Sequence, residues 1–403
     1  MKVFFDVVHE ELSEQVHQFA EDELRDLVPL LEEGGVLIDD LVRKVARMGW
    51  IGVTIPREFG GMGLGHLAKT VIIEELSRVS GAMGAAVQAS QLGVAKIVHF
   101  GNEDQRKYWL PLIASGDCLP TIAVTELNSG GHVLGMASTA VRDGDSYVLN
   151  GHKCFVGNSH IGDVHGVVMR TGPGSRGLSA FLVESSRPGF SLGPMGSQAG
   201  LHGFSYGEIR FDDVRVPVAN RLGDEGMGLD VAYSSSVLYG RANLTAVALG
   251  IHQAVLDETV SFCQARENKN GLLSELPIVA AKIGQIKSNL LTARTVAYHA
   301  VTLLDQGESC DAELMNAKLV NPELALNSVR TAMEIFAARG CQRDFHIERY
   351  LRDVFHTFPA AGTSDIQRLR LAEITCGTYT RSWSEQLTST SVDADDAWDA
   401  EQA

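Results

Sequence analysis

The sequence predicts an α+β fold in which a helical block, a strand-rich block and a second helical block follow one another. Residues 1–117 contain long helix-forming runs that are broken at glycines and at Pro56. Residues 118–225 change to short β-rich runs between Asp-Gly, Pro-Gly and Gly-Asp turns. From residue 226 to 388 the pattern is helical again, and residues 389–403 form an acidic tail that we expect to be disordered.

The first block is helical in the runs 24–50 and 67–100. Between them lies GGMGLG, residues 60–65, which has the look of a phosphate-binding glycine loop. A dinucleotide-binding fingerprint requires a strand before the glycines, whereas the chain before this segment is helical in pattern. We therefore interpret the segment as a structural turn.

The central block shows the alternation of half-buried strands, since apolar Ile209 and Phe211 alternate with charged neighbours in GEIRFDDV. The last block carries a stripe spaced by three and four residues, as expected for the buried face of a helix. Pro322 interrupts a helical run there and predicts a kink or a restart. The stripe consists of Leu290, Ala293, Ala297, Ala300 and Leu304.

Composition excludes several classes of function. The chain has 403 residues and a formal charge of −16, which argues against nucleic acid and anionic lipid as partners. No apolar run approaches the ~18 residues of a membrane span, and the acidic start is unlike a signal peptide. Six scattered cysteines without a CxxC motif indicate reduced thiols and a cytoplasmic location.

Motifs for hydrolysis and for metal binding are missing. There is no GxSxG elbow and no Walker A sequence, which disfavours hydrolases and nucleoside triphosphatases. None of the 13 histidines forms HExxH or a zinc-type Cys/His spacing, so we expect no metal site.

Two longer segments are more specific. Residues 123–158 read AVTELNSGGHVLGMASTAVRDGDSYVLNGHKCFVGN, and residues 332–373 read AMEIFAARGCQRDFHIERYLRDVFHTFPAAGTSDIQRLRLAE. The first resembles TEPxxGSD followed by NGxKxWITN, and the second resembles QxxGGxG followed by ER, RD and EGTSEIQR. In this order they are similar to the acyl-CoA dehydrogenase family of flavoproteins, and the resemblance covers nearly the whole chain.

The resemblance implies an N-terminal helical domain, a central β-barrel-like domain and a C-terminal helical bundle, with FAD between the last two. Family members oxidise an acyl thioester: a glutamate removes the α-proton while a hydride passes from the β-carbon to the flavin. The implied partners are acyl-CoA or an acyl carrier protein, together with further copies of the chain in a dimer or tetramer.

The catalytic glutamate of the family is missing. The usual position, just before Gly-Thr, falls on Ala361, and the alternative position of some branches, just before an arginine, falls on Gly240. Tyr239 and Glu126 are weak replacement candidates, because an ordinary tyrosine is a poor base at neutral pH and the TE glutamate is structural in the family.

Other implied positions are carried over residue by residue. The flavin contacts are also thinned, at Glu334, Ala337 and Ala338 in place of QxxGG and at Pro277 in place of a glutamine, and a glutamate at 334 would repel a pyrophosphate. Arg241, Ala361 and Gly362 are the implied substrate-side residues. The implied cofactor contacts are Val124, Thr125, Gly131, Phe155, Gly157, Arg266, Thr363 and Asp365.

Three functions follow from these observations. The first is an FAD-dependent oxidoreductase that acts on an acyl thioester, in specialised metabolism because the base is lost. The second is a flavin monooxygenase on the same fold, for which Gly131 and Gly157 would leave room for oxygen. The third is a non-catalytic subunit of a heteromeric dehydrogenase, suggested by the thinned intersubunit contacts.

Overall fold

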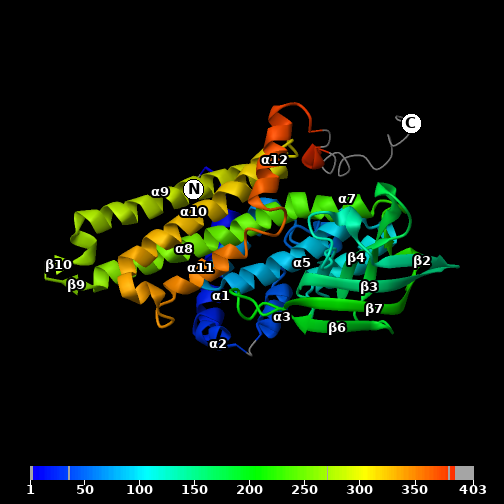
Figure 1. The fold of residues 1–403 in the computed structure, drawn as a ribbon, viewed down its shortest axis with the longest axis horizontal. Helices are drawn as coiled ribbons and strands as arrows, with labels where there is room; N and C mark the ends of the chain where they lie inside the picture. The colour runs from blue at the N-terminus through cyan, green and yellow to red at the C-terminus, as the bar shows by residue number, and fades with distance from the viewer. Residues whose placement is uncertain (1–2, 35–36, 270, 380–381, 386–403) are drawn as a thin grey trace.

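A computed structural model describes residues 3–34, 37–269, 271–379 and 382–385 of the chain (Figure 1). The predicted tail, residues 389–403, lies outside these ranges. Helices gather at one end of the molecule and the sheet lies at the other, with helix α5 (Gly81–Phe100) between them (Figure 1).

The N-terminal helices begin where the sequence supplies caps. Asp6 accepts a hydrogen bond from the backbone N–H of His9, Ser80 caps α5, and Asn102 forms a reciprocal capping box with Gln105. A 3₁₀ turn rather than a strand precedes the glycines at 60–65, as the interpretation of a structural turn requires. Besides α5, these helices are α1 (Val7–Leu24), α2 (Val28–Glu33), α3 (Asp39–Arg47), α4 (Gly65–Val79) and α6 (Glu103–Ala114).

The central block forms an eight-stranded sheet with the path β6-β7-β3-β2-β4-β5-β8, while β1 pairs in parallel with β4. The single register pair Thr139↔Arg170 joins β2 to β4, so the sheet has two halves, and its path ends at β6 and β8 without closing into a barrel. The strands are β1 (Pro120–Ala123), β2 (Thr139–Asp143), β3 (Ser146–Gly157), β4 (Val164–Arg170), β5 (Leu178–Glu184), β6 (Phe190–Met195), β7 (Tyr206–Pro217) and β8 (Arg221–Leu222).

Side chains alternate between the two faces of each strand, as the sequence predicts for β7. Ile209 and Phe211 are buried in the sheet core together with Tyr147 and Phe181, whereas Arg210 is exposed. The rings of Tyr147 and Phe181 lie 4.8 Å apart between centroids. The prediction of a half-buried strand is therefore confirmed.

The C-terminal block is a helical bundle. The predicted stripe of α9 is buried along its whole length, which confirms that face. The restart expected at Pro322 is wrong, because α10 runs unbroken through this buried proline. The elements are α7 (Gly228–Ser234), a π-helical turn (Ser235–Gly240), α8 (Arg241–Ala265), a β9–β10 hairpin (Glu267–Asn268 and Gly271–Leu272), α9 (Pro277–Asp305), α10 (Asp311–Phe336), α11 (Ile347–Phe355) and α12 (Ser364–Thr375).

A buried carboxylate joins the two helical blocks. Glu74 of α4 is almost fully buried and accepts hydrogen bonds from Arg294 Nε at 2.9 Å and from Tyr298 Oη at 2.6 Å, both on α9. A buried ion pair is stable only when its remaining polar atoms are also satisfied, and the tyrosine hydroxyl meets that condition here. The first and last blocks therefore pack as one unit.

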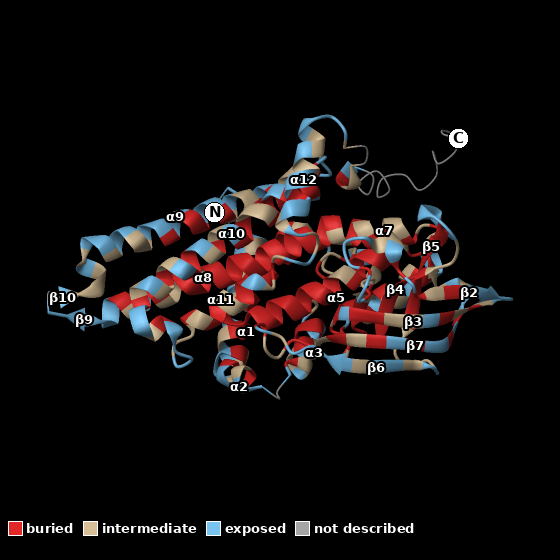
Figure 2. Cartoon of the chain, in the orientation of Figure 1, coloured by how far each residue is buried: buried red, intermediate tan, exposed pale blue. Residues whose placement is uncertain are grey.

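Helix α5 is buried along nearly its whole length (Figure 2). It even buries a lysine, Lys96, whose Nζ donates to the carbonyl oxygen of Gly166 in β4 at 3.0 Å. Burial, helped by the nearby charge of Lys153, lowers the pKa of Lys96 to about 7.

In the described part of the chain, no helix is long and apolar enough to cross a membrane.

This lysine predicts a pH dependence of stability. Between pH 7 and its ordinary pKa of 10.5, Lys96 is protonated in the unfolded chain but neutral in the folded one. Its contribution to the free energy of unfolding therefore rises with pH across this window. We expect Lys96→Met to flatten that rise, measured by urea unfolding at several pH values. Parallel curves for the two proteins would show that Lys96 stays charged when folded.

Candidate active site

The two positions at which the family resemblance places the base lie side by side. Gly240 ends the π-helical turn, and Ala361 lies in the loop between α11 and α12. A Cβ atom added to Gly240 would lie 3.1 Å from the Cβ of Ala361 and 3.6 Å from Cδ2 of Leu92. The structure thus brings both positions to one point, and neither supplies a carboxylate.

The loop that carries Ala361 is held in an unusual conformation. Ala361 has φ +55°, a left-handed value that is uncommon for residues other than glycine, and Gly362 has φ +90°. Buried Gln367 fixes the loop, since its Nε2 donates to the carbonyl oxygens of both residues at 2.9 and 3.0 Å. Among the described residues, no acceptor engages the backbone N–H of Ala361, which leaves it free to bind a carbonyl oxygen.

Arg241, the third predicted substrate-side residue, is buried directly after Gly240. Within the described chain its Nε and Nη1 have no hydrogen-bond partner, and burial lowers the pKa of its guanidinium. Nearby, the buried Lys318 donates to the carbonyl oxygen of Phe358 at 3.3 Å, in the loop that leads to Ala361. Lys318 therefore supports this loop from the bundle side.

On the sheet side, a bulge presents an aromatic ring. The pairing of β3 with β7 shifts register between Lys153 and Val156, and Phe155 within that shift has φ +56°. Such bulges turn a side chain away from its regular direction, and 55% of Phe155 is exposed. Its ring lies 6.0 Å from that of Tyr206 between centroids. The segment of Val124 and Thr125 lies alongside, because Cys154 N–H donates to the Thr125 carbonyl oxygen at 2.9 Å.

Helix α5 connects these two halves of the site. A Cβ atom on Gly157 would lie 2.8 Å from Ala89, while Leu92 reaches Gly240. Helical residues three apart have Cβ atoms about 5–6 Å from each other. The end of β3 and the two base positions are therefore about one helical turn apart.

The loop after β1 presents open backbone. Gly130 and Gly131 are exposed, and a Cβ atom added to either would meet nothing within 4 Å. No hydrogen bond inside the described residues uses the backbone N–H of either glycine. These donors suit an anionic or carbonyl-bearing cofactor, and the exposed ring of Phe155 suits a planar one, so the residues on this side fit FAD.

Two predicted cofactor contacts lie at the start of α12. Thr363 is the N-cap, and its hydroxyl accepts from Ile366 N–H at 3.4 Å. Asp365 is highly exposed and forms an ion pair with Arg368 at 3.0 Å. Both residues follow Ala361 closely along the chain, so they lie at the same end of the bundle as the two base positions.

Arg266 does not join the other predicted residues. It lies at the far end of α8, beside the β9–β10 hairpin (Figure 1). A rise of 1.5 Å per residue places it roughly 39 Å from Gly240 along the helix.

Glu334 is not an unpaired negative charge. Lys282 Nζ donates to its carboxylate at 2.8 Å, and this hydrogen bond lowers the pKa of Glu334. The positive charge of Lys282 therefore offsets the repulsion that Glu334 would exert on a nearby pyrophosphate.

Neither weak candidate is placed to act as the base. Glu126 accepts from Lys153 Nζ at 2.7 Å and from two backbone N–H groups, of Ala137 and Ser138, at 2.6 and 3.0 Å. Burial alone would raise its pKa, yet these hydrogen bonds hold the pKa of Glu126 below its ordinary value. Its oxygens are thus committed to the structure.

Tyr239 is buried and turned towards the N-terminal helices. Its hydroxyl lies 3.3 Å from His99 Nε2, and Lys69 Nζ lies 4.1 Å from the centre of its ring. Burial raises the pKa of Tyr239 to about 12, which keeps it neutral at physiological pH.

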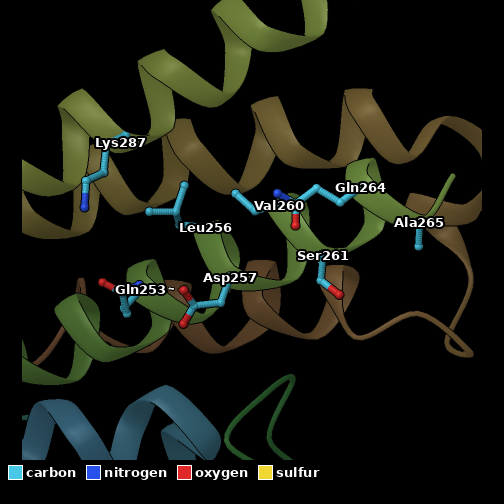
Figure 3. A pocket seen from close by; sticks show the side chains of 8 residues that line it. All are labelled: Gln253, Leu256, Asp257, Val260, Ser261, Gln264, Ala265 and Lys287. Carbon is cyan, nitrogen blue, oxygen red and sulfur yellow. Dashed lines mark hydrogen bonds between the residues drawn. The ribbon is translucent and has the colours of Figure 1, made fainter. Parts of the chain in front are cut away.

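A groove of about 630 Å³ lies elsewhere, between α8 and α9, and none of the predicted site residues lines it (Figure 3). Across the described ranges, no group of three or more metal-ligating side chains is assembled. The groove is lined by Gln253, Leu256, Asp257, Val260, Ser261, Gln264, Ala265 and Lys287.

Sequence reasoning missed several residues that build the site. Leu92 packs beside Gly240, Gln367 fixes the Ala361 loop, and Asn158 fastens β3 to α5. The available signal was the set of polar residues Gln88, Ser90 and Gln91 within a mostly apolar helix, since buried polar side chains require specific partners.

Comparison with known proteins agrees with this arrangement. Models of the N-terminal, middle and C-terminal domains of acyl-CoA dehydrogenases match residues 7–117, 121–214 and 226–375. An acyl-CoA dehydrogenase of Bacillus subtilis is 32% identical, over 91% of this chain and 97% of its own length. The 3-(aryl)acrylate reductase of Clostridium sporogenes is 31% identical, over 92% and 99%. The chain belongs to the acyl-CoA dehydrogenase family.

Solved structures show the same fold. Butyryl-CoA dehydrogenase from Megasphaera elsdenii superposes with a TM-score of 0.89 at 27% identity, covering 92% of this chain and 99% of that one. The prolyl acyl carrier protein oxidase AnaB gives 0.85 at 27% identity, with the same coverage. PigA, solved with FAD and proline, gives 0.86 at 26% identity, covering 93% and 99%. FAD is the cofactor of this family.

The role of Glu126 leads to a prediction of stability. Glu126→Ala leaves the buried Lys153 without its counter-charge, so we expect the free energy of unfolding to fall by about 3–5 kcal/mol. Glu208→Ala removes a more exposed partner, that of His152 at 2.8 Å, and should cost only about 0–1 kcal/mol. Urea unfolding of both variants measures the difference, and equal losses would contradict a structural role for Glu126.

The role of Tyr239 is tested by removing its hydroxyl. Because Tyr239 stays neutral and faces His99, we expect Tyr239→Phe to leave the rate of flavin reduction by a thioester substrate unchanged. Stopped-flow absorbance under anaerobic conditions measures that rate. A large loss in folded, flavin-loaded protein would identify Tyr239 as the base after all.

Proposed function

We propose that this chain is an FAD-dependent oxidoreductase that dehydrogenates an acyl thioester without a carboxylate base of its own. The observation that carries the proposal is the adjacency of Gly240 and Ala361, 3.1 Å apart once a Cβ is added, beneath an unengaged backbone N–H. This arrangement supports a site that binds the acyl carbonyl but lacks a carboxylate to accept the α-proton.

FAD would be held between the sheet and the bundle. Val124, Thr125 and Phe155 would contact the ring system, and the exposed N–H groups of Gly130 and Gly131 would donate to its polar atoms. Bound FAD supplies the acceptor for the hydride that leaves the acyl β-carbon.

The protein residues act on the thioester carbonyl. The backbone N–H of Ala361 would donate to the carbonyl oxygen, stabilise negative charge there and so acidify the α-carbon. A side-chain base contributes about 10²–10⁴-fold in rate. A substrate with an already acidic α-position compensates for that loss, and its proton then passes to water or to a group on the substrate itself.

The thioester is carried by CoA or by an acyl carrier protein. Butyryl-CoA dehydrogenase and the prolyl acyl carrier protein oxidase both share this fold over nearly the whole chain. The lost base and the carrier protein oxidase among the neighbours support a role in specialised metabolism. The six cysteines, none of them in a disulfide, fit a cytoplasmic location.

We also propose that the chain works as a homo-oligomer, a dimer or a tetramer. Arg266 lies roughly 39 Å along α8 from Gly240, so it is too distant to contact FAD in its own chain and would serve a neighbouring copy.

The monooxygenase alternative loses one of its supports, because Ala89 and Phe204 fill the space beside Gly157.

The first test of the proposal is the visible spectrum of the purified protein. We expect a flavin absorbance band that bleaches anaerobically when an activated acyl thioester is added. Protein without flavin would instead support the non-catalytic subunit, and oxygen consumption with hydroxylated product would support a monooxygenase.

The second test restores the base. Ala361→Glu places a carboxylate beside Gly240, where the absent side chain leaves space, so we expect faster flavin reduction by a plain acyl-CoA, up to about 10²–10⁴-fold. Ala361→Gln is the matched control of equal size without the charge. No gain in a folded, flavin-loaded Ala361→Glu variant would mean that the acyl site itself is remodelled.

A further inference from the structure

One face of α5 carries Ala85, Gln88, Ala89 and Leu92. Ala85, Gln88 and Ala89 retain 2, 9 and 5% exposure, and Leu92 is half-buried. Their spacing of three, four and seven residues defines a single helical face. Because Leu92 contacts Gly240, this face is the wall of α5 that borders the base positions.

Two hydrogen-bond acceptors on this wall and on the facing helix have no donor. Oε1 of Gln88 and Oδ1 of Asn243 are both buried and lack a partner within the described chain. The orientation of Asn243 is fixed, since its Nδ2 donates to the Gln88 carbonyl oxygen at 3.3 Å and the oxygen of the amide must therefore point elsewhere. Leaving a buried acceptor unsatisfied costs about 1–3 kcal/mol.

Helices α5 and α8 lie against each other, so Gln88 and Asn243 form a second pair next to the pair of Leu92 and Gly240. Leu92 faces Gly240, and one turn away the backbone of Gln88 meets Asn243. One helical turn spans about 5.4 Å. Gln88 and Asn243 thus lie about one turn along their own helices from Leu92 and Gly240.

We propose that Gln88 and Asn243 form a polar subsite which selects an acyl group bearing its own hydrogen-bond donor, a hydroxyl or an amine, in place of a plain hydrocarbon chain. This inference rests on the proposed function and names its substrate class. A methyl group at the subsite would leave both acceptors unpaired, whereas a hydroxyl or ammonium group satisfies at least one of them.

The test compares two acyl groups of nearly equal size, γ-hydroxybutyryl and pentanoyl, both as pantetheine thioesters. Calorimetric titration of the flavin-loaded protein measures binding whether or not the flavin is reduced. We expect the hydroxyacyl thioester to bind roughly tenfold more tightly, the effect of one to two neutral hydrogen bonds. Equal affinities, tighter binding of the pentanoyl thioester, or binding of neither overturns the proposal without the use of any variant.

Variants assign the preference to these side chains. Gln88→Leu and Asn243→Leu should each bring the affinity ratio close to one. Gln91→Leu is the matched control, because Gln91 is buried on the same helix with an equally unpartnered Oε1, but its Nε2 donates to the carbonyl oxygen of Trp50 at 3.3 Å, away from Asn243. A preference that persists in a folded Gln88→Leu variant, or one that Gln91→Leu abolishes equally, overturns the assignment.

The same titration separates this inference from the proposed function. Preferential binding of the hydroxyacyl thioester without any flavin bleaching supports the polar subsite and contradicts the oxidoreductase. Equal binding of the two thioesters with bleaching by both does the reverse.

Discussion

The position of the candidate site depends on one buried asparagine. Asn158 follows the last residue of β3 in the left-handed conformation, and its Nδ2 donates to the Ala86 carbonyl oxygen at 2.7 Å and to Ser90 Oγ at 2.9 Å. Its own N–H donates to the Ser205 carbonyl oxygen at 2.6 Å. Since both partners on α5 are buried, these bonds form in a low dielectric and orient the two elements strongly. They place the Phe155 bulge against the same helix that borders Gly240.

Helix α5 therefore sets the distance between the sheet side and the bundle side of the site. Its Ala89 touches the end of the sheet and its Leu92 touches the bundle, while Lys96 fastens the helix to β4. Gln88 and Gln91 extend the same pattern, because the Gln88 carbonyl oxygen accepts from Asn243 of the bundle and Gln91 Nε2 donates to the carbonyl oxygen of Trp50, just after α3. A helix this buried tolerates little movement, since interiors are packed as densely as crystals of small molecules. Sheet and bundle are consequently held in one fixed relation.

Much of the fold could be predicted from the sequence because periodicity reports burial directly. The stripe of α9 and the alternation of β7 emerged as expected. The restart expected at Pro322 did not occur, because a helix held on both sides by tertiary packing tolerates a proline that its local sequence disfavours. The absence of a carboxylate base, inferred from motif order, stays a prediction. The adjacency of Gly240 and Ala361, and the partners of Glu126 and Gln88, could not, since they depend on contacts between residues that are distant in the chain.

The closeness of Gly240 and Ala361 has a consequence for how such chains evolve. According to the family resemblance, some branches carry the carboxylate at one of these positions and other branches carry it at the other. Two carboxylates on side chains whose Cβ atoms lie only 3.1 Å apart would repel each other, which favours protonation of one of them. A lineage that moves its base from one position to the other must therefore pass through that repulsive pair or through a stage that has neither. This chain has the sequence of the second stage, from which either arrangement is one residue away.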